Sequence, residues 1–137
     1  MAKLTIFFDR CFGTGLPQWL RKFETPFDVE YHDDPKHGFT QTTQDDVWLS
    51  AVGAKNWVVL SHDKRFHRDG MAVQAVKQHG IACFYLDGGT YPSWDKHILF
   101  GRRFTRVKDI VSSTRRPFIY RIHHRGDVRR ITATWAP

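Results

Sequence analysis

The sequence predicts an α/β fold in which helices cover a central, mostly parallel sheet. Short apolar runs at 4–8, 57–61 and 81–86 have the length and the unbroken hydrophobicity of strands that are buried on both faces. Helix-like segments alternate with these runs, as in βαβ units. Each run is followed within two residues by an aspartate, and ligand sites in open α/β sheets lie at the carboxyl ends of the strands. We therefore expect the ligand-binding or catalytic residues of this protein at the carboxyl ends of the strands.

The N-terminal part is predicted to contain a strand, a helix and a second strand. The first strand, 4–8, leads into a turn with two glycines, and Pro17 is expected as the first residue of the helix. Pro26 ends this helix, and a short strand follows at 29–31. The helix between the two strands predicts that they are parallel.

A second helix is predicted to begin beside two adjacent aspartates. Thr42 can form a capping box with Asp45, or Thr43 can form one with Asp46. Either choice uses one aspartate at the helix start and leaves the other to point toward the strand ends. Gly53 is expected to end this helix before the next strand.

The rest of the chain is predicted to form two helices, a strand between them and a hairpin. The first of these helices ends at His79-Gly80. Ser93 is expected to cap a long amphipathic helix, which Pro117 ends. Two strand-like segments, 118–122 and 128–132, flank an Arg-Gly-Asp turn, and this pattern predicts a β-hairpin.

Length and composition indicate one globular domain. With 137 residues, 41% of them hydrophobic, we expect a single domain over 1–137, with a core at 3–90 and a basic C-terminal helix and hairpin at 93–135. No apolar run approaches the roughly 18 residues that span a bilayer, and no signal-peptide pattern is present at the start. A cytoplasmic protein without membrane contact is therefore expected. Cys11 and Cys83 form no metal-binding or redox motif and are expected to be buried free thiols.

The net charge of +7 is distributed unevenly along the chain. Residues 1–100 contain 11 Lys and Arg against 12 Asp and Glu, whereas residues 101–137 contain 10 Lys and Arg against 2 Asp. A solvated basic face would explain this split. The alternative is a phosphate-binding surface beside an acidic centre, which is typical of an enzyme that acts on nucleic acid.

Several aspartates are placed where they could hold a divalent cation. Asp9 and Asp63 follow two predicted strands, and Asp45 or Asp46 comes from a helix start. Mg²⁺ and Mn²⁺ prefer oxygen ligands, and such an ion can polarise a phosphoryl oxygen and activate an attacking water. These acids therefore predict a metal site suited to cutting phosphodiesters.

Four histidines raise zinc as another possibility, but their spacing does not favour it. They form two pairs with a five-residue spacing, which does not place both side chains on one helix face, and no thiolates accompany them. The histidines are His32, His37, His62 and His67.

The order of the motifs resembles a known family. The run Ile6-Phe7-Phe8-Asp9, followed by Leu16-Pro17 and an amphipathic helix, resembles the opening of PIN-like domains. The run 43–49, then Gly53, then 57–66 is similar to the central signature of the VapC45-type PIN-like group, in which an Asp-x-x-Trp helix start precedes a strand ending in Thr/Ser-x-Asp-Lys/Arg. The resemblance covers roughly residues 3–86. It implies a Rossmann-like α/β/α sandwich and an Mg²⁺- or Mn²⁺-dependent ribonuclease, often the toxin of a toxin–antitoxin pair.

The resemblance also implies roles for individual residues. Asp9, Asp45 and Asp63 match the metal-binding acids, and Asp45 is favoured over Asp46 because it lies three residues before a tryptophan. Ser61 stands where threonine is commoner and is expected to hydrogen-bond a carboxylate or a water. A fourth acid found in other PIN domains has no clear match. The candidates for it are Asp46, which we rank first, Asp69 and Asp87.

The function predicted in this way is that of a metal-dependent endoribonuclease. Its expected partners are RNA, an antitoxin protein whose acidic tail could bind the basic hairpin, and a second copy of the chain. The rival hypothesis is a non-catalytic RNA-binding or protein-interaction module on the same fold; a phosphatase or receiver-like site is weaker, because no acid partner for a nucleophilic aspartate is evident. The residues expected to hold the RNA backbone are Lys64, Arg65, Arg102, Arg103, Arg115 and Arg116.

Overall fold

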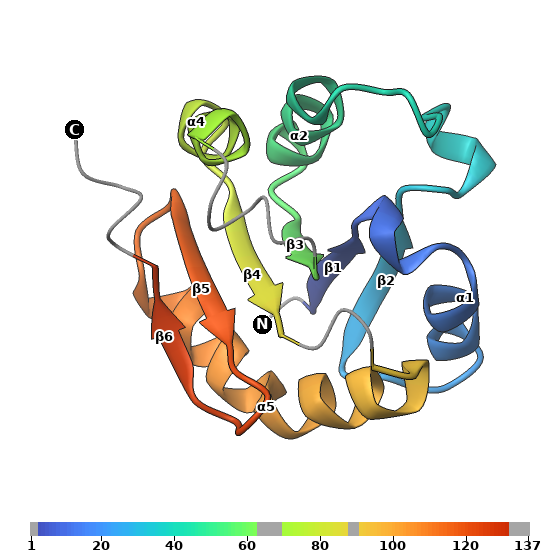
Figure 1. Ribbon diagram of the computed structural model, residues 1–137, viewed down its shortest axis with the longest axis vertical. Helices are drawn as coiled ribbons and strands as arrows, with labels where there is room; N and C mark the ends of the chain where they lie inside the picture. The colour runs from blue at the N-terminus through green and yellow to red at the C-terminus, as the bar shows by residue number, and fades with distance from the viewer. Residues whose placement is uncertain (1–2, 63–69, 88–90, 132–137) are drawn as a thin grey trace.

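A six-stranded sheet with the strand order β2-β1-β3-β4-β5-β6 runs through the centre of the protein (Figure 1). The computed structural model describes residues 3–62, 70–87 and 91–131. Strands β1 to β5 are parallel, and β6 is antiparallel to β5. The predicted α/β class with a mostly parallel sheet is confirmed. The strands are β1 (Leu4–Phe8), β2 (Phe27–Tyr31), β3 (Val58–Ser61), β4 (Ala82–Leu86), β5 (Phe118–Ile122) and β6 (Val128–Arg130).

Helices cover both faces of this sheet, α2 and α4 on one and α1 and α5 on the other (Figure 1). Alternate residues of each strand face opposite layers: Phe7 packs with the α2 and α4 side chains, whereas Ile6 and Phe8 pack with those of α1 and α5. This arrangement explains why the strands are apolar throughout rather than alternating. The helices are α1 (Gly15–Arg21), α2 (Asp45–Ala54), α4 (Gly70–Gln78) and α5 (Ser93–Ser113), with short 3-10 turns η1 (Arg10–Phe12) and η2 (Pro35–His37).

The chain reverses its direction of travel across the sheet between β1 and β3. From β1 it moves outward to β2, returns to pair β3 with the other side of β1, and then continues to β4 and β5. In sheets of this kind the crevice at such a reversal, beyond the carboxyl ends of the two strands, is the usual ligand site. Asp9 directly follows β1, and His62 directly follows β3.

Three helices begin differently from the sequence prediction, and the N-cap of α5 is Pro92 rather than the predicted Ser93. Helix α1 begins at Gly15, two residues before Pro17, and ends at Arg21. The predicted capping box is wrong: Gln44 is the N-cap of α2 and makes no side-chain cap hydrogen bond. The hydroxyl of Thr43 instead accepts a hydrogen bond from the backbone N–H of Thr40 at 2.8 Å, because residues 40–43 form their own turn.

Gly53 has a packing role rather than the predicted helix-ending role. Helix α2 continues through it to Ala54, and the chain turns at Asn56, whose φ is 61°. A Cβ atom at Gly53 would lie 2.6 Å from the carbonyl oxygen of His79. The glycine therefore allows α2 to contact the end of α4.

The predicted C-terminal hairpin is present, but its first strand also belongs to the main sheet. Strand β5 pairs in parallel with β4, with Ala82 opposite Phe118, and in antiparallel fashion with β6. The C-terminal quarter thus extends the sheet directly. None of the helices in the described ranges combines the length and the hydrophobicity of a transmembrane span.

Candidate functional site

Asp9 is a buried carboxylate at the reversal point of the sheet, with 1% of its surface exposed. Its Oδ1 accepts a hydrogen bond from the backbone N–H of Arg10 at 2.6 Å, which begins η1. Its Oδ2 accepts a hydrogen bond from Ser61 Oγ at 2.9 Å and lies 3.6 Å from Cys11 Sγ. The end of β1 and the end of β3 are therefore joined through this one side chain.

Asp45 is the first residue of α2, and its side chain points back toward η1. Its Oδ1 accepts a hydrogen bond from Trp48 Nε1 at 3.0 Å, and Trp48 is fully buried. The spacing of three residues places both side chains on the same side of the helix, which explains the Asp-x-x-Trp pattern. The same oxygen is 3.3 Å from a guanidinium nitrogen of Arg10.

Arg10 connects the two acids. Its backbone N–H binds Asp9 while its guanidinium binds Asp45 and donates to the carbonyl oxygens of Thr43 at 2.7 Å and Gln41 at 3.3 Å. The start of α2 is thereby held against the end of β1. No role for Arg10 was predicted from the sequence, although it directly follows the strand-ending aspartate.

Asp46 lies apart from this arrangement. Its side chain is 64% exposed, and its Oδ1 is 2.7 Å from Nε2 of His79 at the end of α4. Asp46 is the residue ranked first for the fourth acid, and it pairs with His79 after α4 rather than with Asp9 or Asp45. Asp63, Lys64, Arg65, His67 and Asp69 lie outside the described residues.

Asp87, another candidate for the fourth acid, follows β4 and is held by the hairpin. Arg121 donates to both of its oxygens, at 3.0 and 3.1 Å, and the backbone N–H of His124 lies 3.3 Å from Oδ2. Burial alone would raise the pKa of Asp87, but the hydrogen bonds from His124 and Arg121 outweigh it, and the pKa is lowered. This carboxylate therefore fixes the end of β4 to the turn after β5.

Two clusters elsewhere could supply three ligand atoms to a metal, as judged over the described ranges. Both contain a carboxylate that already pairs with an arginine, Asp87 with Arg121 and Asp34 with Arg21. Within the described part of the chain no such cluster joins two of the four histidines considered for zinc. The clusters are Asp87, His123 and His124, and Glu30, Asp34 and His37.

Lys96 is a buried cation beside the candidate site. Its place there was not predicted from the sequence. It lies in the first turn of α5, only 9% of its surface is exposed, and its Nζ is 5.7 Å from the ring centre of Phe12 in η1. Burial lowers the pKa of Lys96, and the nearby Cys11 opposes that shift. A signal was available, since Lys96 continues the apolar helical spacing of Phe100 and Phe104.

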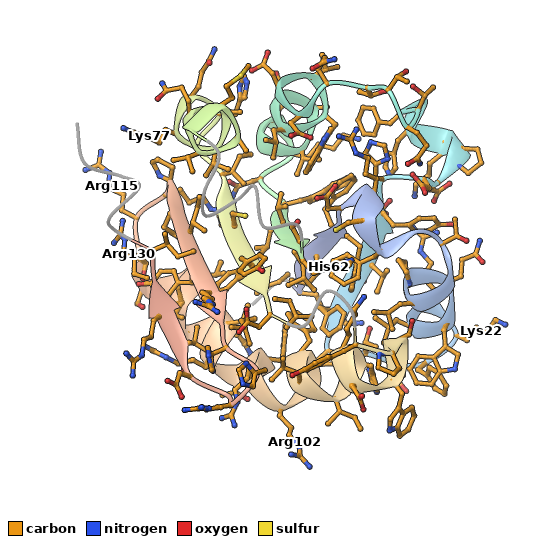
Figure 2. All side chains as sticks on the ribbon, viewed as in Figure 1. Lys22, His62, Lys77, Arg102, Arg115 and Arg130 are labelled. Atoms are coloured by element: carbon orange, nitrogen blue, oxygen red, sulfur yellow. The ribbon has the colours of Figure 1, made fainter. Side chains whose placement is uncertain are left out.

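The basic residues of the C-terminal quarter divide between two ends of the sheet. Arg102 and Arg103 line a cavity with residues of the turn after β5, at the carboxyl end of that strand. Arg116 donates to the carbonyl oxygen of Trp57 at 3.3 Å, just before β3 begins, and is therefore at the amino ends of the strands. Figure 2 shows Arg102 and Arg115 far apart. The four arginines predicted to hold RNA do not form one surface.

The oxygen donors around Asp9 fit a hard cation by their chemistry. Asp9 and Asp45 contribute carboxylates from different elements, and Ser61 contributes a hydroxyl that already orients one of them. Mg²⁺ and Mn²⁺ accept such ligands. The guanidinium of Arg10 on Asp45 is a competing positive charge at the same place.

The fold and this site define an α/β protein with acidic residues at the reversal point of a parallel sheet. A family model described as PIN like domain matches residues 4–88, which is more than half of the chain. The chain belongs to the PIN-like domain family, whose fold is typical of nucleases. Neither the comparison with curated proteins nor the comparison with solved structures gave a match.

Proposed function

We propose that this protein is an Mg²⁺- or Mn²⁺-dependent endoribonuclease, the toxin of a VapC45-type toxin–antitoxin pair. The observation that carries the proposal is the buried Asp9 carboxylate, oriented by Ser61 and linked through Arg10 to Asp45. A buried carboxylate held by directed donors at a ligand crevice is more typical of a functional site than of surface charge.

We assign the following roles to the residues of the site. Asp9 and Asp45, with Asp63 beyond the described residues, would hold the cation, and Ser61 would keep the Asp9 carboxylate in one orientation. When bound, such a cation supplies polarisation of the phosphate and activation of a water. Lys96 would bind a phosphate oxygen of the RNA, because its ammonium lies next to η1 and no ion pair of it is found in the described ranges. Lys64, Arg65, Arg102 and Arg103 would hold the RNA backbone.

The decisive experiment is RNA cleavage by the purified protein with Mg²⁺ or Mn²⁺, with and without a chelator. We expect cleavage to need the metal and to fall by at least about 100-fold in Asp9→Asn and in Asp63→Asn. Asp46→Asn is the matched control, because this acid is exposed and paired with His79. Full activity in the Asp9 or Asp63 variant would refute the assignment.

The rival, a non-catalytic RNA-binding module, makes a different prediction for the same proteins. Its RNA affinity would fall with salt but would be unchanged by chelator and by the Asp→Asn substitutions. The toxin role is tested separately by expressing the protein in a bacterium: growth arrest that disappears with Asp9→Asn supports it, and unimpaired growth with an RNA-cleaving protein contradicts it.

A further inference from the structure

A cavity lies at the amino ends of the strands, at the opposite edge of the sheet from Asp9. Its volume is about 420 Å³, which is within the range of roughly 300–1,000 Å³ for pockets that hold whole small molecules. Its walls come from the start of β1, the link between α2 and β3, the end of α5 and the segment before β5. Four segments that are distant in sequence therefore enclose one space.

Three cations and no acid line this cavity. The cations are Lys3, Lys55 and Arg116. In the described part of the chain, none of the three forms an ion pair with a carboxylate. Positive charges that no neighbouring acid neutralises attract an anion.

The pairing of β1 with β3 brings the two lysines to the same place. Ile6 lies opposite Val58 in this pair of parallel strands. Lys3 precedes Ile6 by three residues, and Lys55 precedes Val58 by three residues. Both lysines therefore come from the same end of two adjacent strands, whose axes are about 4.8 Å apart.

Trp57 connects Lys55 with Arg116. Nζ of Lys55 lies 4.6 Å from the centre of the Trp57 ring. A guanidinium nitrogen of Arg116 donates to the carbonyl oxygen of the same residue at 3.3 Å. Two of the three cations are thus held against one residue of the lining.

Arg116 is partly desolvated without a compensating acid. Its side chain is half-buried, and burial lowers the pKa of its guanidinium with no carboxylate opposing the shift. Its bond to the carbonyl oxygen of Trp57 is the one hydrogen bond of this guanidinium found over the described ranges. An anion in the cavity would accept further hydrogen bonds from it and replace the lost hydration.

The rest of the lining suits an organic group attached to the anion. Leu4, Val58 and Val111 supply apolar surface, and Thr5 and Asn56 supply a hydroxyl and an amide. A phosphate ion alone would leave most of the volume unfilled. A phosphate monoester carries about −1.5 to −2 charges at pH 7, which three cations can balance.

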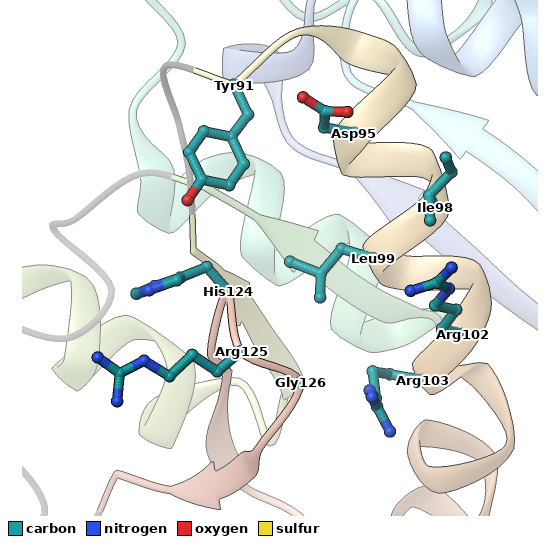
Figure 3. Close-up of a pocket in the computed structure, with 9 residues that line it drawn as sticks. All are labelled: Tyr91, Asp95, Ile98, Leu99, Arg102, Arg103, His124, Arg125 and Gly126. Atoms are coloured by element: carbon teal, nitrogen blue, oxygen red, sulfur yellow. The ribbon is translucent and has the colours of Figure 1, made fainter.

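The basic cavity between α5 and the β5–β6 turn lacks this arrangement. Figure 3 shows Arg125 pointing away from α5 and from Arg103, and Asp95 lines the same space. The positive charges there do not gather around one ligand.

We propose that the cavity at the amino ends of the strands binds a nucleoside monophosphate, with Lys3, Lys55 and Arg116 holding the phosphate and the apolar surface contacting the nucleoside. A free nucleotide fits better than the RNA of the proposed function, because an RNA strand bound at the carboxyl ends of the strands does not pass this edge of the sheet. The site is therefore separate from the metal site and does not depend on RNA cleavage.

The test is a titration of the ¹⁵N-labelled protein with adenosine monophosphate, in EDTA and at constant ionic strength. In ¹H–¹⁵N spectra, saturable shifts are expected for the backbone signals of Leu4 and Asn56 and for the indole signal of Trp57. The signal of His124, at the other end of the sheet, should not move. Shifts at His124 without shifts at the first three residues overturn the proposal.

Substitutions of the cations measure their part in the affinity. Lys55→Gln and Arg116→Gln are each expected to weaken binding of adenosine monophosphate about tenfold, the loss of one charge-assisted contact. The matched control is Lys22→Gln, which removes a charge from an exposed residue after α1 outside the cavity and should weaken binding less than about twofold. Lys55 is exposed, so its variant tests the site even if loss of the Arg116 contact with Trp57 impairs folding. Equal affinities in Lys55→Gln and Lys22→Gln overturn the proposal.

Three further probes identify the part of the ligand that is recognised. Adenosine and inorganic phosphate should each bind at least about tenfold more weakly than adenosine monophosphate. Equally tight binding of adenosine overturns the role of the cations, and equally tight binding of phosphate overturns the role of the nucleoside. A 2′-O-methylated RNA that displaces adenosine monophosphate at a lower concentration overturns the assignment in favour of RNA.

The Asp9→Asn variant separates this site from the proposed function. It should lose RNA cleavage and bind adenosine monophosphate as the wild type does. Loss of nucleotide binding in Asp9→Asn would place the nucleotide at the metal site and overturn the proposal. A protein that cuts no RNA but binds the nucleotide through Lys55 refutes the proposed function and keeps this site.

Discussion

Arg10 lies directly on Asp45: a guanidinium nitrogen is 3.3 Å from Asp45 Oδ1, with 19% and 14% of the two side chains exposed. The same guanidinium is anchored by the carbonyl oxygen of Thr43 at 2.7 Å. An arginine cannot lose its proton under ordinary conditions, so its charge is permanent. A metal ion that approaches Asp45 must therefore compete with a cation already present.

The first prediction is that Arg10→Gln tightens Mn²⁺ binding. Removing the competing charge should raise affinity by about three- to tenfold, since a partly screened contact of this kind corresponds to roughly 1 kcal/mol. Free Mn²⁺ in solution, followed by electron paramagnetic resonance, gives the affinity independently of any cleavage. Arg129→Gln is the control because Arg129 also pairs with a carboxylate, Asp127, in the C-terminal hairpin. Weaker Mn²⁺ binding in Arg10→Gln would show that Arg10 organises the acids more than it competes for them.

The second prediction concerns Ser61, whose hydroxyl is fully buried against Asp9. Ser61→Ala should lower the free energy of unfolding by about 1–3 kcal/mol, because a buried carboxylate loses a donor that water does not replace. Chemical denaturation measures the change. Ser50→Ala, on the exposed face of α2, should change it by less than about 0.5 kcal/mol. Equal effects of the two substitutions would contradict the importance of the Ser61 hydrogen bond.

The third prediction is that Lys96→Met stabilises the fold while weakening RNA binding. Burial disfavours the ammonium and lowers the pKa of Lys96, so the unfolded chain binds its proton more strongly than the folded chain does. The stability of the wild type should therefore rise as pH increases toward the unfolded lysine value of about 10.4, and the methionine variant should lack that slope. At pH 7 we expect the free energy of unfolding of Lys96→Met to exceed that of the wild type by about 1 kcal/mol, as measured by chemical denaturation.

Lys108→Met is the control for Lys96, since Lys108 is exposed on the same helix. It should change stability little and reduce RNA affinity only through the loss of one charge. If Lys96→Met binds a non-cleavable, 2′-O-methylated RNA as tightly as Lys108→Met does, Lys96 has no role in RNA binding.

The fourth prediction concerns the acid dependence of the Asp87 contact. The pKa of this carboxyl is lowered, so its stabilising contribution is present above the unfolded value of about 3.9 and is lost as pH falls through the folded value. Asp87→Asn should lower the free energy of unfolding by about 1–2 kcal/mol at pH 7, a figure kept small because Arg121 is 39% exposed. The difference from wild type should shrink in denaturation at pH 3, whereas Asp28→Asn, an exposed substitution on β2, should show little difference at either pH. A difference that is the same at both pH values would contradict the ion pair as its source.

The fold was predictable because unbroken apolar strands and alternating helices leave few arrangements. Burial on both faces requires helices on both sides of the sheet, and the sequence contains helical segments in the right order. The helix boundaries were less predictable. Thr43 was equally suited to capping α2 and to closing a turn with Thr40, and a local pattern cannot decide between two nearby backbone partners.

The site was predictable only where chain position determines geometry. Asp9 lies at the end of a parallel strand, and its place at the reversal point follows from the order of the elements. Contacts between segments that are distant in sequence position the side chains of Arg10, Lys96 and Arg103. The distribution of charge along the chain does not specify such contacts. The same reason explains why Arg116 appeared to belong with Arg102, although the two are at different ends of the sheet.

The pairing of β5 with β4 has a consequence for any shortened version of this protein. The family match ends at residue 88, two residues after β4. A chain cut at that point would leave the N–H and C=O groups along one side of Ala82–Leu86 without their partners, on a strand whose five residues are all buried in the intact protein. Long, apolar, unpaired strands recruit other chains and promote aggregation. In the intact protein, β5 supplies these backbone partners and covers this side of β4.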